Sequence, residues 1–101
     1  MKRRKITWSP TAIRHFSSWI QYVAQHSIKS AEKERVKLLK SVSQLQAFPE
    51  SGRMVPEFGN PNLREIIQKP IRIIYSLKSK EIRLLAFHHS KMQLDISLFN
   101  S

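Results

Sequence analysis

The sequence contains no cysteine among its 101 residues, and this absence excludes a disulfide scaffold and catalysis by a thiolate. A cysteine-free chain also fits a reducing compartment. No apolar run approaches the roughly 20 residues that a membrane span needs, and no hydrophobic segment of a signal peptide follows the basic start MKRRKITWSP. We therefore expect a soluble, cytoplasmic protein without a membrane partner.

Acidic residues are scarce as well. Seven Asp and Glu stand against 18 Lys and Arg, which gives a formal net charge of +11. The excess is spread along the chain, with ten basic and three acidic residues in 1–50 and eight and four in 51–101. A field of one sign attracts partners of the opposite sign. The expected partner is thus nucleic acid or an acidic protein.

The first half of the chain carries helix signals. KITW at 5–8 suits a short strand, and Ser9 followed by Pro10 is typical of a helix N-terminus. A connector at 27–30 precedes a second helix that is predicted to run to about Ala47, and a connector this short predicts an antiparallel helix pair. The apolar stripes of the two helices are interpreted as core and not as a cofactor site. They comprise Ile13, Phe16, Ile20, Val23 and Ala24, and then Val36, Leu39, Val42 and Leu45.

Glycine is rare, and both glycines lie with three of the five prolines in a loop at 49–62. Beyond it, Leu63 to Gln68 is predicted as a strand, Pro70 as its boundary and Ser79-Lys80 as a turn between two further strands. The predicted register pairs Tyr75 with Leu84, Ile73 with Ala86 and Ile71 with His88. The face turned to the helices would hold Ile71, Ile73, Tyr75, Leu77, Ile82, Leu84 and Ala86. The uncovered face would hold Arg72, Ile74, Ser76, Arg83, Leu85, Phe87 and His89.

These elements predict an α+β domain that spans residues 1–101. An N-terminal antiparallel helical hairpin packs on a small antiparallel β-sheet, and the short N-terminal strand joins the sheet at its edge. At this length a single core folds without disulfides or metals. Few ligand types are available near the two histidines His88 and His89, so the sequence predicts no metal and no cofactor.

The order of helix, helix, Gly-Arg loop and strands resembles the RelE/ParE superfamily of toxins from type II toxin–antitoxin systems. The resemblance covers nearly the whole chain, and FPESGRMVPEFGNPNLREII and IRIIY are its most specific parts. It implies a cognate antitoxin protein as partner, with operator DNA contacted only indirectly through that antitoxin. It also implies either of two activities, which are cleavage of messenger RNA on the ribosome and inhibition of DNA gyrase.

A ribonuclease without a metal needs a general acid, a general base and cations that stabilise the phosphorane. The candidate acid is His89, and the candidate bases are Glu57 and Glu65. The candidate phosphate clamps are Arg53, Arg64, Arg72 and Lys91. The chain departs from the ribonuclease pattern because it has no tyrosine after Tyr75. The resemblance therefore favours the ParE-like branch with gyrase as target, and the RelE-like ribosome-dependent endoribonuclease is the alternative.

A partner is expected to contact the uncovered sheet face. The predicted contacts are Arg53, Arg64, Arg72, Ile74, Arg83, Leu85, Phe87 and His89. Several have a structural alternative. Arg53 could instead cap the loop carbonyls, Arg64 and Arg72 could be surface charges, and the histidines could be packed or solvated strand-end residues. If the two arginines are exposed, each contributes within about 0.5 kcal/mol to folding. Trp19 and Tyr22 are interpreted as rim of the core, although aromatic rings near cations can stack on bases.

Overall fold

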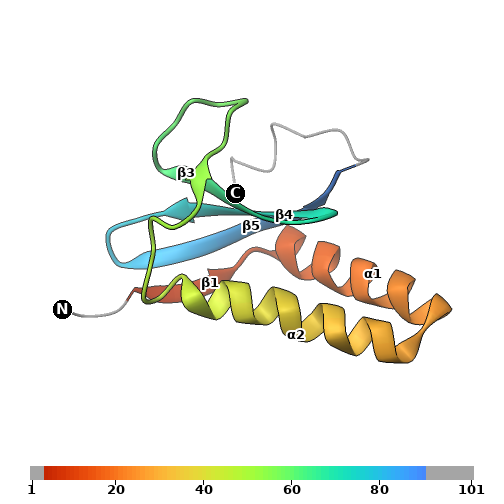
Figure 1. Cartoon of the computed structure of the whole chain (residues 1–101). Coiled ribbons are helices and arrows are strands. Elements are labelled where there is room, and N and C mark those ends of the chain that lie inside the picture. Colours follow the sequence, from red (N-terminus) through yellow and green to blue (C-terminus); the bar gives the residue numbers. More distant parts are fainter. Residues whose placement is uncertain (1–3, 91–101) are drawn as a thin grey trace.

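The computed structural model describes residues 4–90, which form two helices and five strands (Figure 1). Strand β1, Lys5–Trp8, leads directly into helix α1, Pro10–His26. Ser9 is the N-cap, as predicted, because its Oγ accepts a hydrogen bond from the Ala12 amide at 3.0 Å and Pro10 opens the helix. Ser9 Oγ also donates to the Leu85 carbonyl at 3.1 Å. One fully buried serine thus starts the helix and attaches it to the sheet.

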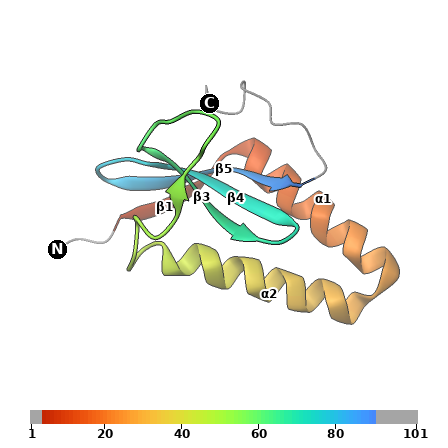
Figure 2. The same ribbon diagram turned by 45° about the horizontal axis from the view of Figure 1, so that its top comes forward.

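Helix α2, Ile28–Gln44, follows after a single capping residue, Ser27, so the predicted four-residue connector is wrong. The two helices run side by side in opposite directions on one side of the sheet (Figures 1 and 2). Their buried faces differ in part from the predicted stripes. Ile13 and Val36 are exposed, whereas Ala12, Ala31, Leu38, Val42 and Leu45 are buried. The spacing of apolar residues along both helices is therefore as predicted. At one end of each helix, however, the buried side is shifted by about one residue from the predicted stripe.

The sheet has five strands in the order β1-β5-β4-β3-β2. Its further strands are β2, Arg53–Met54, β3, Leu63–Gln68, β4, Ile71–Leu77, and β5, Glu81–His89. The edge position predicted for the N-terminal strand is confirmed, but β1 pairs with β5 in parallel, so the sheet is not wholly antiparallel. Strand β2 was not predicted, because two residues inside a loop give no periodic signal.

The predicted register holds on one side of a β-bulge and fails on the other. Tyr75 pairs with Leu84, and the Ser79-Lys80 turn is present, as predicted. Between Ile74 and Tyr75 the pairing shifts, so that Ile74 faces Ala86 and Leu85 is the extra residue on β5. One inserted residue reverses which side of the sheet each later side chain faces. Consequently Phe87 and His89 point to the helices, and Ala86 and His88 point away from them.

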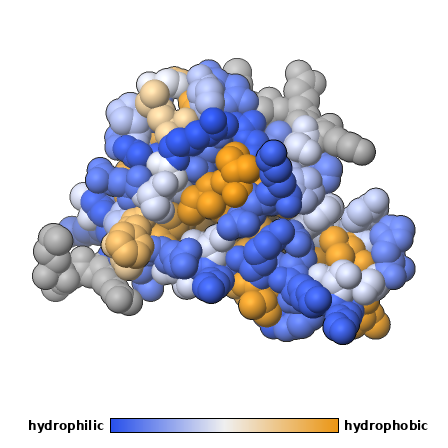
Figure 3. All heavy atoms as spheres, in the orientation of Figure 1, coloured by the Kyte–Doolittle hydropathy of each residue, from blue (hydrophilic) through white to orange (hydrophobic). Residues whose placement is uncertain are grey.

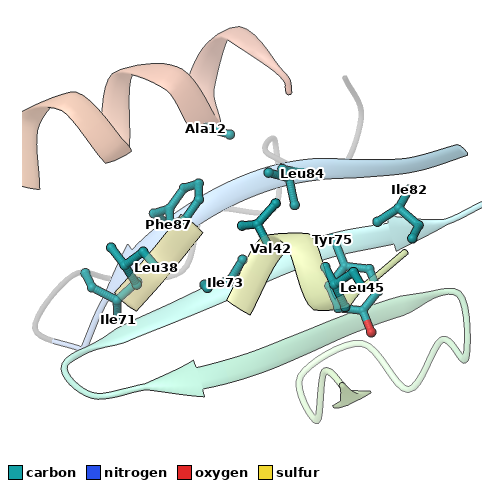
Figure 4. Close-up of a cluster of buried hydrophobic side chains, with 10 residues drawn as sticks. All are labelled: Ala12, Leu38, Val42, Leu45, Ile71, Ile73, Tyr75, Ile82, Leu84 and Phe87. Carbon is teal, nitrogen blue, oxygen red and sulfur yellow. The ribbon is translucent and has the colours of Figure 1, made fainter. Parts of the chain in front are cut away.

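The main core lies between the sheet and the helical hairpin (Figure 4). Leu38 and Val42 of α2 and its C-cap residue Leu45 pack against buried side chains of β4 and β5. Phe87 is centred among aromatic rings, at 5.2 Å from Trp8 and 5.2 Å from Phe16 between ring centroids. This ring cluster fastens β1, α1 and β5 to one another, because each ring comes from a different element.

A second, smaller core lies on the opposite face of the sheet. Val55 and the half-buried Phe58 and Leu63 pack there on Ile74, Leu85 and Ala86. The loop between β2 and β3 therefore covers part of the face that the sequence left open (Figure 2). No helix within residues 4–90 is long and apolar enough to cross a membrane. Hydrophilic residues cover most of the surface seen in Figure 3, with apolar residues in separate patches.

Candidate functional site

A cluster of opposite charges occupies the sheet face away from the helices, at the end near β2. Glu65 on β3 lies at its centre, and its side chain is 0% exposed. Its Oε2 accepts a hydrogen bond from Arg53 Nε at 2.6 Å, and its Oε1 accepts one from Arg72 Nε at 2.7 Å. Arg72 Nη2 forms an ion pair with the same carboxylate. Two arginines thus compensate one fully buried negative charge.

Arg72 also reaches out of the sheet to the loop. Its two terminal nitrogens each donate to one carboxylate oxygen of Glu57 at 2.9 Å. This forked pair has the geometry that a guanidinium and a carboxylate prefer. Hydrogen bonding from Arg72 lowers the pKa of Glu57 to about 2, and the hydrogen bond to Glu57 raises the pKa of Arg72 above its usual value. Arg72 therefore bridges a buried and an exposed carboxylate and holds the loop on the sheet.

A groove of about 650 Å³ opens beside this cluster, where β3 turns into β4. Arg53, Lys69 and Arg72 supply its cations. The remaining lining is Ile67, Pro70, Ile71 and Ser90. The sequence predicted the arginines but missed Ile67 and Lys69. A lysine in a tight turn next to an alternating strand was the available signal, because such a turn places its charge at the end of the sheet.

Arg64 has a different role from the other arginines. Its Nε donates to the Pro61 carbonyl at 3.0 Å, and its Nη1 donates to the Gly52 carbonyl at 3.0 Å. Tyr75 holds the same segment, because its hydroxyl accepts from the Gly52 amide at 3.1 Å and donates to the Pro49 carbonyl at 2.8 Å. Arg64 thus caps the loop carbonyls, whereas Arg53 pairs with Glu65.

The apolar part of the predicted partner surface is not accessible. Ile74 and Leu85 lie under the loop between β2 and β3, and Phe87 is in the main core. All three are at most 2% exposed. The expectation that they form an uncovered patch is therefore wrong. Two physical causes are responsible, which are the loop that packs on the sheet and the bulge that turns Phe87 inward.

The remaining predicted residues are dispersed. The sheet face that points away from the helices is called the open face. Arg83 lies at its β1 end, where the guanidinium donates to Thr7 Oγ1 at 3.4 Å. His89 faces the helices, with its ring centroid 5.1 Å from that of Trp19. His88, which pairs with Arg72 across the strands, is buried, and neither of its ring nitrogens has a hydrogen-bond partner among residues 4–90. Lys91 lies outside the described residues.

The geometry of the open face suits binding better than acid–base catalysis. Glu57 has a pKa of about 2 and is a weak base at neutral pH. Glu65 is buried, and its oxygens already accept hydrogen bonds from two arginines. His89 lies on the other side of the sheet from Arg72, so acid and clamp do not converge. Within residues 4–90 no three His, Cys, Asp or Glu side chains group closely enough to hold a metal.

The pairing of Glu57 predicts a defined pH dependence of stability. Its carboxylate is stabilised in the folded chain, where its pKa is about 2 and not the ordinary 4.5. The contribution is therefore present above pH 4.5 and is lost as the pH falls towards 2, since the unfolded chain binds the proton first. Urea unfolding at a series of pH values is expected to show a smaller loss over this window for Glu57→Gln than for the wild type. Parallel curves would contradict the pairing.

Comparisons with known proteins agree with this architecture. Residues 6–94 match the family model described as the ParE toxin of type II toxin–antitoxin system, parDE. A solved structure titled the chromosomal ParDE toxin–antitoxin system from P. aeruginosa has a TM-score of 0.70 at 21% identity, covering 86% of this chain and 96% of that one. A YoeB dimer from Staphylococcus aureus has a TM-score of 0.53 at 21% identity, covering 87% and 98%. No curated protein is similar enough in sequence to count as a match.

Proposed function

The chain belongs to the ParE toxin family of type II toxin–antitoxin systems, and on that premise we propose that it inhibits growth by binding and poisoning DNA gyrase in the cytoplasm. The family match over residues 6–94 is the observation that carries this proposal. An inhibitor that holds its target in a non-productive state needs no catalytic groups of its own. The engaged carboxylates of the open face are consistent with such a role.

We propose the groove beside the charge cluster as the binding surface for the cognate antitoxin. Its cations suit acidic side chains of a bound segment, and Ile67 and Pro70 offer apolar contacts between them. Arg53 is accessible there, because 62% of its side chain is exposed. The proposal moves the contact surface from the buried Ile74 and Leu85 to the adjacent end of the same face. Operator DNA would then be contacted only through the antitoxin.

The alternative activity is ribosome-dependent cleavage of messenger RNA, as in the RelE-like branch. The likeness to the YoeB dimer concerns the fold alone at 21% identity. In this chain the candidate acid His89 is separated by the sheet from the candidate base Glu65 and clamp Arg72. The cluster thus lacks a free base next to a free acid. This arrangement favours a binding mechanism over hydrolysis.

The experiment is induction of the protein in cells without its antitoxin. We expect altered plasmid supercoiling and a DNA-damage response at early times, while bulk protein synthesis continues. Purified protein is expected to stabilise cleaved DNA in a reaction with gyrase. Early arrest of translation with intact supercoiling would show that the ribosome is the target. Under that outcome His89→Ala would slow cleavage by about 100-fold, the usual scale for loss of a general acid.

A pair of charge reversals separates the antitoxin surface from general electrostatics. Lys69→Glu alters the groove, and Lys33→Glu changes the net charge equally on an exposed position of α2. We expect Lys69→Glu to weaken binding of the antitoxin strongly and Lys33→Glu to leave it nearly unchanged, as measured by calorimetry. Equal weakening by both variants would assign the affinity to the overall field of the protein and not to the groove.

A further inference from the structure

A second cavity lies on the helix side of the sheet, between α1 and the ends of β4 and β5. Its volume is about 480 Å³, within the roughly 300–1,000 Å³ of small-ligand sites. The lining is unusually rich in flat rings. It consists of His15, Ser18, Trp19, Tyr22, Ile71, Phe87 and His89. Neither the charge cluster nor the groove beside it uses any of the rings in this aromatic cavity.

The rings are arranged as a platform. Tyr22 and Trp19 stack with their centroids 5.8 Å apart and their planes 18° apart. His89 and His26 continue the row without stacking, since His89 is tilted by 56° at 5.1 Å from Trp19 and His26 meets Tyr22 edge-on at 5.3 Å. Tyr22 is 55% exposed although it belongs to this row, so much of its ring meets solvent. Stacked side chains with an accessible ring are the surface on which unpaired nucleobases bind.

A polar group inside the cavity also lacks a partner. His15 Nδ1 is buried, and it makes no hydrogen bond within the described chain. Burial, more than the nearby Arg14 charge, lowers the pKa of His15 below its usual value. Burial thus favours the neutral ring, in which this atom is either an acceptor or a donor. The exposed hydroxyl of Ser18 lies one helical turn away on the same face.

The charged residues around the cavity are compatible with a negatively charged ligand. Helix α1 contains no acidic residue, and Arg14 is exposed next to His15. The nearby carboxylate of Glu34 accepts a hydrogen bond from Trp19 Nε1 at 3.1 Å and forms an ion pair with Lys37 at 3.1 Å. The protein as a whole carries a net charge of +11. The positive charge of the protein thus attracts a phosphate backbone that passes along α1, and this helix has no carboxylate that would repel it.

From these observations we propose that the aromatic cavity binds an unpaired base of single-stranded nucleic acid. The base stacks on the exposed part of the Tyr22 ring, and His15 and Ser18 line the cavity beside it. The phosphates lie along the exposed side of α1 near Arg14. Stacking selects for an unpaired base without strong sequence preference, because every base has an aromatic face. Of the residues that line the groove proposed for the antitoxin, Ile71 alone also lines this cavity.

The test uses purified full-length protein and a labelled single-stranded DNA oligonucleotide in fluorescence anisotropy. Tyr22→Ala is expected to weaken binding about 5- to 100-fold, the usual range for removal of one stacking ring, and Tyr22→Phe is expected to restore it. Ile28→Ala is the matched control, because Ile28 is 81% exposed and does not line the cavity. The same oligonucleotide with abasic sites keeps the charge and is expected to bind as weakly as Tyr22→Ala does.

Three results would overturn the proposal. Equal affinity for the intact and the abasic strand would mean that only charge attracts the nucleic acid. Unchanged affinity in Tyr22→Ala would mean that the cavity serves another occupant, such as a protein segment. Binding of AMP as tight as that of the strand would make the ligand a free nucleotide. Circular dichroism of each variant ensures that a loss of binding is not a loss of folding.

Discussion

Arg72→Ala is expected to destabilise the protein by about 3 kcal/mol, at the lower end of the range for a buried ion pair that loses one partner. The reason is Glu65, whose side chain is fully buried and which, among the described residues, would keep only Arg53 as a counter-charge. The variant also frees Glu57 and so releases the loop from the sheet. For a domain of this size the thermal midpoint should fall by roughly 10–25 °C.

A double-mutant cycle tests the cause of this loss. Glu65→Leu combined with Arg72→Ala removes the orphaned charge together with its partner, and it should recover much of the stability that the single variant loses. Arg83→Ala is the control on the same face, where the guanidinium makes a long hydrogen bond of 3.4 Å to Thr7. Equal small effects of Arg72→Ala and Arg83→Ala would restore the interpretation of Arg72 as a surface charge.

Phe87→Ala is expected to cost about 3–5 kcal/mol, the usual penalty for truncation of a buried phenylalanine. Phe87 is 2% exposed, and its ring lies among those of Trp8 and Phe16. Phe48→Ala removes the same atoms from a side chain that is 65% exposed, and it should change the free energy of unfolding by less than about 0.5 kcal/mol. Urea denaturation of the two variants compares identical chemistry at different burial.

The Phe87 experiment also decides the strand register. If β5 had no bulge, Phe87 would face away from the helices, and Ala86 would lie in the main core. A small effect of Phe87→Ala, similar to that of Phe48→Ala, would support that arrangement. A large effect supports the observed pairing of Phe87 with Ile73 and of Ala86 with Ile74.

Local sequence signals determined most of the fold. Ser9 and Pro10 mark the start of α1 because capping and the fixed φ of proline act on neighbouring residues. The turn at Ser79-Lys80 and the boundary at Pro70 are likewise decided by a few consecutive residues. Periodicity alone identified two helices and three of the strands. The motifs in the loop and in β4 were sufficient to indicate the toxin superfamily, which the family match confirms.

Tertiary structure decided which charges became structural. In the sequence, Glu65 is an ordinary polar residue of an alternating strand. The pairing of β2, β3 and β4 brings Arg53 and Arg72 to its carboxylate. The contact with Glu57 depends on how the loop folds over the sheet, and the sequence contains no periodic signal for that path.

The bulge is the other feature that only the tertiary structure determined. Its single extra residue, Leu85, lets Leu85 and Ala86 pack under the loop while Leu84 and Phe87 remain in the main core. Binary patterning assumes strict alternation, so it placed Phe87 and His89 on the wrong face. The sequence by itself thus determined the two helices, four of the five strands and the family of this protein. Packing between distant elements decided which face of the sheet each side chain occupies, and hence where the groove and the cavity lie. The reason is that burial depends on contacts between residues far apart in the sequence, which no local pattern records.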